Sequence, residues 1–139
     1  MALEVGMEWT ESEDVTMERT AGVLGSGGLQ VYATPAMVLL MEKSAWKLAE
    51  QEMEDGMTTV GTSLNIKHLS ASPIGSHITC HAKLVEIDRK RLVFEVEVLD
   101  EQGKVGEGIH ERFLVQGEKF LQKAEEKLAK ETAGKRNNE

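Results

Sequence analysis

A carboxylate inside an otherwise apolar helix is the first sign of chemistry in this sequence. Glu42 lies in the stretch VYATPAMVLLMEKSA, and its neighbours three and four positions away include Val38, Ala45 and Trp46, all apolar. Residues with this spacing share one face of a helix, so Glu42 is expected at the edge of the buried face. Burial disfavours the charged form of a carboxylate, which suits an acid/base group. A local ion pair with a neighbouring lysine, or with a cation on a sheet, explains the residue equally well.

Thr34 stands at the expected start of the same helix, directly before Pro35. Threonine before proline is an ordinary N-cap, but its hydroxyl could also meet a bound carbonyl oxygen beside the free N–H groups of the first turn. Thr34 and Glu42 lie eight positions apart. That spacing is ~12 Å along a helix, and the lean of the side chains leaves a gap of roughly 6–8 Å. If the two cooperate, we expect them to act across a substrate, or with one of them supplied by a second copy of the chain.

His68 is a third candidate, near the end of an alternating segment. It falls in phase with Val60, Thr62, Leu64 and Ile66, so it is expected to face the core. A histidine in such a position is more often a satisfied structural group than an acid/base catalyst. The end of a strand is nevertheless where a core face opens toward a cleft, so both roles stay open.

His110 and Arg112 belong to a later alternating segment, out of phase with Ile109 and Phe113. This phase predicts that the two basic side chains lie on a solvated polar face. The alternative is a contact with a phosphate group or with a second subunit.

A long helix and several strands must position these residues. The helix is expected to begin at Thr34 and to end near Gly56, where glycine acts as a stop signal. Upstream, residues 15–20 are predicted as a strand and residues 22–28 as a glycine-rich linker. The linker sequence GVLGSGG lacks the Lys-Ser/Thr pair of a phosphate-binding P-loop.

After Gly56 the hydrophobic period changes from that of a helix to that of strands. The positions expected on common faces are Val60, Thr62, Leu64, Ile66 and His68; Ile78, Cys80, Ala82 and Leu84; Leu92, Phe94, Val96 and Val98; and Ile109, Glu111, Phe113 and Val115. Hairpin turns are expected at 88–90 and 100–104, and a looser turn at SASPIG. An amphipathic helix is expected over about 118–131, followed by a disordered polar tail at 134–139.

The order of these elements predicts an α+β fold. An antiparallel sheet would wrap around one long central helix, with a C-terminal amphipathic helix added. The length suits a single domain, expected over residues 1–133. Because such a sheet leaves an edge or a face available to a partner, we expect the chain to form homodimers, and pairing of dimers into tetramers stays open.

Composition excludes several classes of function. The net charge of −8 argues against general nucleic-acid binding, since a phosphate backbone rewards lysine and arginine. The single cysteine, Cys80, excludes an internal disulfide and suits a reducing compartment. No Cys/His cluster has metal-ligand spacing, no signal peptide is recognisable, and no run approaches the ~20 apolar residues of a membrane span. We therefore expect a cytoplasmic protein without metal, membrane or nucleic-acid partners.

Three segments resemble a known family. They are YATPAMVLLMEKSA, then TTVGTSLNIKHLSASPIGSHITCHAKLVEID, and then GKVGEGIHERFLV. They are similar to the fluoroacetyl-CoA thioesterase-like branch of the hotdog-fold superfamily, over about residues 31–123. The resemblance implies a hotdog fold that dimerises side by side, with active sites near the dimer interface.

The resemblance also implies a reaction and its residues. The catalytic threonine, glutamate and histidine of the family fall on Thr34, Glu42 and His68. The glycine whose amide approaches the thioester oxygen falls on Gly61, and the arginine near the pocket on Arg112. The implied reaction is hydrolysis of an acyl-CoA thioester, with coenzyme A as part of the substrate and no cofactor. Glu42 would act as nucleophile or as general base, and His68 as acid/base.

Selectivity for fluorine is not expected. The stretch in the place of the family's aromatic lid, LGSGGLQVY, has little bulk beyond Leu24, Leu29 and Tyr32. A general short-chain acyl-CoA thioesterase is therefore the expected function. The alternative is a non-catalytic hotdog module that binds acyl-CoA as a sensor or partner. A hotdog hydratase is a weaker alternative, because its Asp/His pair is not found.

Overall fold

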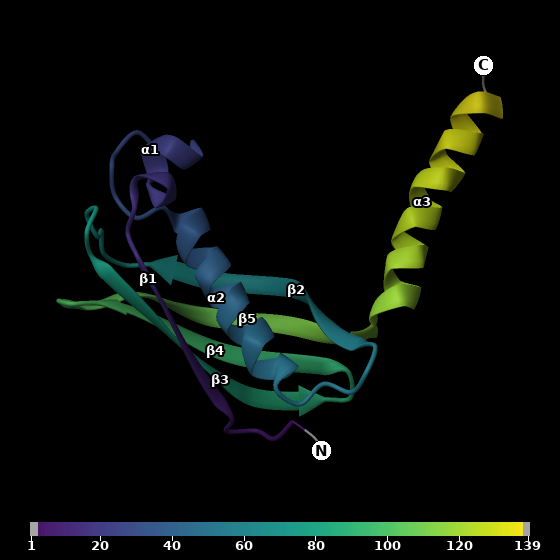
Figure 1. Ribbon diagram of the computed structural model, residues 1–139, viewed down its shortest axis with the longest axis horizontal. Coiled ribbons are helices and arrows are strands. Elements are labelled where there is room, and N and C mark those ends of the chain that lie inside the picture. The colour runs from purple at the N-terminus through teal and green to yellow at the C-terminus, as the bar shows by residue number, and fades with distance from the viewer. Residues whose placement is uncertain (1–2, 138–139) are drawn as a thin grey trace.

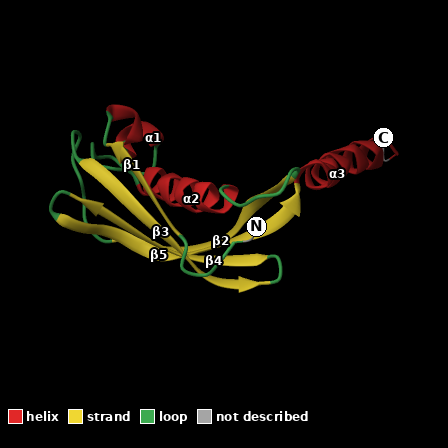
Figure 2. Cartoon of the chain, turned by 60° about the horizontal axis from the view of Figure 1, so that its bottom comes forward, coloured by secondary structure: helices red, strands yellow, loops and turns green. Residues whose placement is uncertain are grey.

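The chain folds into one curved antiparallel sheet with a long helix lying across its face. The computed structural model describes residues 3–137, with side chains up to residue 130. The elements in chain order are β1 (Glu8–Asp14), η1 (Met17–Arg19), α1 (Ala21–Leu24), α2 (Thr34–Glu50), β2 (Met57–His68), β3 (His77–Asp88), β4 (Arg91–Asp100), β5 (Gly103–Gln116) and α3 (Gly117–Asn137). The strand order in the sheet is β1-β3-β4-β5-β2, so β1 and β2 form its two edges. Figure 1 and Figure 2 show α2 on the inner side of the curved sheet and α3 projecting from one end.

The core lies between α2 and the three central strands. Strands β3 and β4 alternate as the sequence predicts, with every second side chain buried against the helix. The largest fully buried apolar side chains include Met37, Leu40, Met41 and Leu48 from α2, and Ile78, Leu84, Leu92, Phe94 and Val98 from the sheet. The predicted α+β architecture, a sheet around one long helix with an added C-terminal helix, is thus confirmed. The two predicted hairpins are also present, at β3–β4 and β4–β5.

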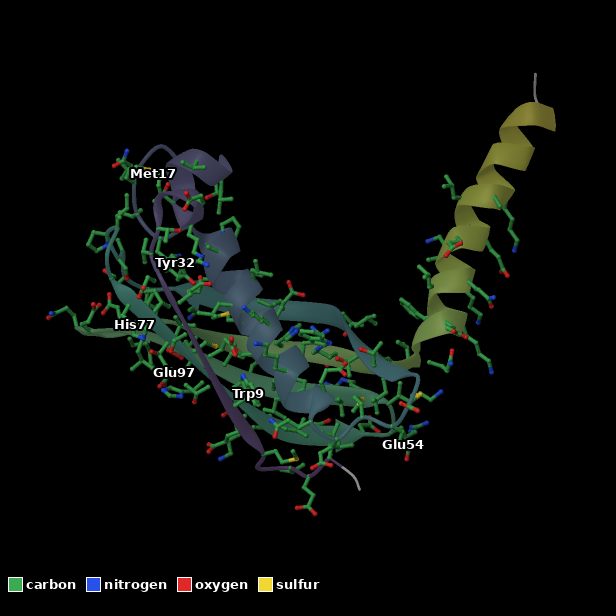
Figure 3. The ribbon with its side chains drawn as sticks, in the orientation of Figure 1. Trp9, Met17, Tyr32, Glu54, His77 and Glu97 are labelled. Carbon is green, nitrogen blue, oxygen red and sulfur yellow. The ribbon has the colours of Figure 1, made fainter. Side chains whose placement is uncertain are left out.

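The first strand lies earlier in the chain than predicted. Residues 15–20, predicted as a strand, instead contain buried Val15 and the short helix η1, and part of the predicted linker forms α1. The strand itself, EWTESED, is rich in acidic residues, which are depleted in strands. It is tolerated because its inward glutamates find partners: Lys47 Nζ donates to Glu11 at 3.1 Å, and the Tyr32 hydroxyl donates to Glu13 at 2.7 Å. Figure 3 labels Trp9, which is on β1, and Tyr32, the partner of Glu13.

The long helix is shorter than predicted. It ends at Glu50 rather than near Gly56. Thr58 Oγ1 donates to the Glu50 side chain at 2.6 Å, which ties the end of α2 to the start of β2. Gly56 has a φ of 80°, so it serves the turn into β2 and does not end the helix.

Strand β2 contains a bulge between Gly61 and Ser63, where its register with β5 shifts. Leu64 and Ile66 face the helix side as predicted, opposite His110 and Gly108 on β5. Val60 pairs with the half-exposed Phe113 on the other face. The prediction of one continuous face from Val60 to His68 is therefore wrong, because the extra residue of a bulge reverses the alternation.

The last helix is longer than predicted and packs little against the sheet. It runs to Asn137, so it includes part of the predicted tail at 134–139, of which 138–139 lie outside the described residues. Phe120 and Leu121 are 46% and 59% exposed. Figure 2 shows the helix leading away from the sheet.

Candidate active site

Thr34 and His68, far apart in the sequence, meet where α2 begins and β2 ends. The Thr34 hydroxyl lies 2.7 Å from His68 Nδ1. The expectation that Thr34 is the N-cap is wrong: Ala33 is the N-cap residue of α2 and makes no side-chain cap bond, and Thr34 is already inside the first turn. The threonine hydroxyl is therefore directed to the histidine and not to the helix backbone.

The other ring nitrogen of His68 has no partner among the described residues. Nε2 is buried and makes no hydrogen bond. Burial lowers the pKa of His68, so the ring is neutral near pH 7. Thr34 and His68 line a pocket of about 310 Å³, together with Tyr32, Ser70 and other residues. A neutral imidazole in a residue that lines a pocket suits proton transfer to or from a bound molecule.

Glu42 lies in a second group, with Gly61 and Arg112. Its carboxylate oxygen Oε2 is 4.0 Å from Arg112 Nη1, and its side chain is 42% exposed. A Cβ atom added to Gly61 would lie 3.0 Å from the same oxygen and 3.4 Å from Arg112 Nη1. Glycine at position 61 therefore lets the strand backbone approach the carboxylate closely. The expected burial of Glu42 is only partial, but its position at the edge of the buried face is confirmed.

Arg112 and His110 are buried, so the prediction of a solvated polar face is wrong. His110 is 1% and Arg112 is 6% exposed, whereas Ile109 is 42% and Phe113 is 39% exposed. The polar side chains can face the helix because they satisfy one another. Arg112 Nε donates to Thr59 Oγ1 at 2.8 Å, and Nη2 donates to the Thr59 carbonyl at 3.0 Å.

His110 completes this buried group and was not predicted as part of the site. Arg112 Nη1 lies 3.2 Å from His110 Nε2, and His110 Nδ1 lies 2.8 Å from the Ser63 carbonyl. One signal in the sequence was available. Gly106 and Gly108 share the phase of His110, and a Cβ atom at Gly106 would lie 2.5 Å from Met37 Sδ on α2. Alternate glycines thus mark the face of β5 that comes closest to the helix.

The five predicted site residues form two groups along one helix, α2, and two strands, β2 and β5. Thr34 and His68 make one group, while Glu42, Gly61 and Arg112 make the other. The helix positions of Thr34 and Glu42 are ~12 Å apart by helical rise. Within the described part of one chain, no hydrogen bond or ion pair joins the two groups.

Metal-ligating clusters and membrane spans are not found in the described residues. No group of three or more His, Cys, Asp or Glu side chains among them could hold a metal ion. Within the same range, no helix is both long and apolar enough to cross a membrane.

Comparison with known proteins gives concordant matches. The family described as fluoroacetyl-CoA-specific thioesterase matches residues 15–118. The fluoroacetyl-CoA thioesterase of Streptantibioticus cattleyicolor is 34% identical over 98 residues, which is 70% of each chain. A solved structure of the fluoroacetyl-CoA thioesterase FlK superposes with a TM-score of 0.85 at 29% identity, covering 91% of this chain and 98% of FlK. A thioesterase superfamily member from Thermus thermophilus gives a TM-score of 0.82 at 25% identity, covering 99% and 98%.

A sheet curved around one long helix, shared with the solved thioesterases above, defines the hotdog fold. The chain belongs to the fluoroacetyl-CoA-specific thioesterase family. It is accordingly a thioester hydrolase of the acyl-CoA class, as the sequence predicted.

The burial of two histidines predicts how stability depends on pH. Burial lowers the pKa of both His68 and His110 below the ordinary 6.5. As the pH falls through that value, the unfolded chain takes up protons before the folded chain does. The free energy of unfolding is therefore greatest above about pH 6.5 and falls below it, by at most about 1.4 kcal/mol per pH unit for the fully buried His110.

Urea unfolding between about pH 7.5 and pH 5 measures this slope, above the range in which carboxylates dominate. His110→Gln, whose amide does not titrate, should reduce the slope. A free energy of unfolding that is constant over this range in the wild-type protein contradicts the prediction.

Proposed function

We propose that the protein hydrolyses short-chain acyl-CoA thioesters to the free acid and coenzyme A, using Thr34, Glu42 and His68. The observation that carries the proposal is the 2.7 Å contact between Thr34 and His68 beside a pocket, with His68 Nε2 left unsatisfied. A short acyl group is supported by the relatives, since structures of FlK variants hold acetyl-CoA, or fluoroacetate with CoA.

In the proposed reaction, Glu42 either attacks the thioester carbonyl carbon or removes a proton from a water that does so. The C–S bond breaks, and the proton given up by the attacking water passes through the neutral imidazole of His68 to the departing coenzyme A sulfur. If Glu42 is the nucleophile, this water hydrolyses the acyl-glutamate intermediate in a second step and releases the free acid. The Gly61 amide is the proposed donor to the carbonyl oxygen as negative charge develops there. Arg112 supplies a positive charge 4.0 Å from the carboxylate. Thr34 orients His68 and the carbonyl group.

The segment in the place of an aromatic lid supports broad specificity rather than selectivity for fluorine. Tyr32 is 1% exposed and donates its hydroxyl hydrogen to Glu13, so its ring is part of the core. Leu24 and Leu29 are 49% and 70% exposed and provide no aromatic cover. A panel of acyl-CoA thioesters, including acetyl-CoA and fluoroacetyl-CoA, tests this with a thiol-release assay. Tight binding of coenzyme A without release from any thioester would instead favour a binding module.

We further propose that the protein acts as a homodimer and that each site draws on two subunits. The separation between the Glu42 group and the Thr34–His68 pair supports this arrangement, since one chain does not bring them into contact. Strand β2, which carries Gly61 and His68, is an edge strand able to pair with a second copy. Leu39 and Trp46 on the adjacent helix are 64% and 41% exposed, so they offer apolar surface for the same contact.

Location in the cytoplasm remains a prediction from the sequence.

Mixing two inactive variants tests the shared site. Glu42→Gln and His68→Ala are each expected to lose most thioesterase activity. If the site is shared, a mixed dimer contains one site with both residues intact, so activity returns after the two variants are unfolded and refolded together. Sedimentation analysis checks that dimers form. Dimers that regain no activity would place both groups in the same subunit's site.

A further inference from the structure

His110 is a fully buried histidine whose two ring nitrogens both have fixed partners. Nδ1 lies 2.8 Å from the Ser63 carbonyl, which can only accept a hydrogen bond. Nε2 lies 3.2 Å from Arg112 Nη1, which can only donate. Nδ1 must therefore carry the hydrogen, and Nε2 must offer its lone pair. The surroundings select a single neutral tautomer, and the side chain is 1% exposed.

Arg112 is held by three of its nitrogens. Nε and Nη2 donate to the side chain and the carbonyl of Thr59, and Nη1 donates to His110. Nη1 is also the nitrogen nearest to Glu42, at 4.0 Å from Oε2. This distance is longer than a hydrogen bond, so Oε2 accepts no hydrogen bond from Nη1. The positive charge of the guanidinium is nevertheless close enough to stabilise the carboxylate electrostatically.

We propose that His110 is a positioning residue that holds Arg112 away from direct contact with Glu42. The proposal rests on the proposed role of Glu42 as nucleophile or base. By accepting the Nη1 hydrogen bond, His110 fixes the guanidinium beside the carboxylate and prevents the close pair that would otherwise form. A carboxylate bound directly by arginine is a poorer nucleophile and base, since its lone pairs are occupied. Gly61 lies against the same three side chains, with the position of its missing Cβ 3.2 Å from His110 Cε1.

Removal of the histidine acceptor has a defined consequence. In His110→Leu, Nη1 loses its partner, and a buried donor without a partner is costly. The nearest acceptor is Glu42, which needs only a small side-chain movement to close the 4.0 Å gap. We expect kcat to fall about tenfold or more, with KM changed much less, because the loss affects the reacting carboxylate and not the binding of coenzyme A.

His110→Gln is the matched control. A glutamine amide can donate to the Ser63 carbonyl and accept from Arg112 Nη1, so it is expected to restore most of kcat. His110→Asn, which is too short to reach both partners, serves as a second loss variant if His110→Leu does not fold. Circular dichroism and urea unfolding give the folded fraction to which each rate is normalised.

A double-mutant cycle with Glu42→Gln decides the mechanism. If His110 acts through Glu42, His110→Leu lowers kcat in the wild-type background and has little further effect in the Glu42→Gln background. Normalised kcat that is unchanged in His110→Leu, or equal losses in both backgrounds, overturns the positioning role. Full activity of Glu42→Gln alone refutes the proposed function of Glu42 and is a separate result from either of these.

Discussion

Replacement of His68 by alanine is expected to lower kcat for acyl-CoA hydrolysis by about 10²–10⁴-fold, the usual contribution of a positioned acid/base group. His68 is the only described residue with a buried side-chain nitrogen or oxygen that lacks a hydrogen-bond partner. Its ring is neutral, because burial lowers its pKa, and Thr34 fixes its orientation from the other nitrogen. Steady-state thiol release under saturating substrate measures the effect.

The control for this substitution is His77→Ala. His77 is also a strand histidine with a hydrogen-bond partner, Asp14, but its side chain is 56% exposed and it lies outside the pocket. It should leave kcat essentially unchanged. If His68→Ala keeps the wild-type kcat, His68 has no catalytic role. If kcat falls equally in His68→Ala and His77→Ala, the cause is a general effect on the fold.

The largest expected effect on stability comes from Gly108→Ala in β5. An added Cβ would lie 2.3 Å from Ile66 Cγ2 and 2.5 Å from the Asn65 carbonyl oxygen. Both atoms belong to β2, and the carbonyl oxygen is backbone, so relief requires the two strands to separate. We expect the free energy of unfolding to fall by about 3 kcal/mol, at the upper end of the usual cost of overpacking. Urea unfolding near pH 7.5 measures this loss.

Gly28→Ala provides the matched comparison for that loss. No heavy atom lies within 4 Å of its added Cβ, and its backbone is not in the left-handed region. This substitution should be neutral or slightly stabilising, because alanine restricts the unfolded chain more than glycine does. Equal free energies of unfolding for the two variants would contradict the close approach of β5 to β2 at Gly108.

The helix and the central strands were predictable because their periodicity is set by burial alone. Ile78 to Leu84 alternate strictly, and Leu92 to Val98 do so apart from the buried Val93; each inward position is apolar. The two strands that carry the site were less regular. On β5, His110 occupies a buried position that hydropathy assigns to solvent, since partners distant in the sequence supply its hydrogen bonds. A local sequence pattern does not show that a polar side chain will find hydrogen-bond partners elsewhere in the chain.

Type and spacing singled out Thr34, Glu42, His68 and Arg112 as candidates, and the family resemblance added Gly61, but the grouping of these residues was not predicted. Thr34 and Glu42 both lie in α2, as the sequence predicted, eight positions apart. The pairing of Thr34 with His68 depends on where β2 ends relative to the start of α2. The pairing of Glu42 with Gly61 and Arg112 depends on the register between β2 and β5. Both are properties of the assembled sheet, which the spacing within any one element does not determine.

Because of the bulge in β2, the geometry of the site depends on how many residues separate Gly61 from His68, as well as on which residues they are. Gly61 and His68 are separated by an odd number of positions, so in a regular strand they would face opposite sides of the sheet. The exposed extra residue, Thr62, restores a common side by shifting the alternation once. Loss of a single residue at this surface position would therefore turn either the amide-bearing glycine or the histidine away from the helix. Homologous sequences that keep every site residue but differ in length between Gly61 and His68 would not build the same site.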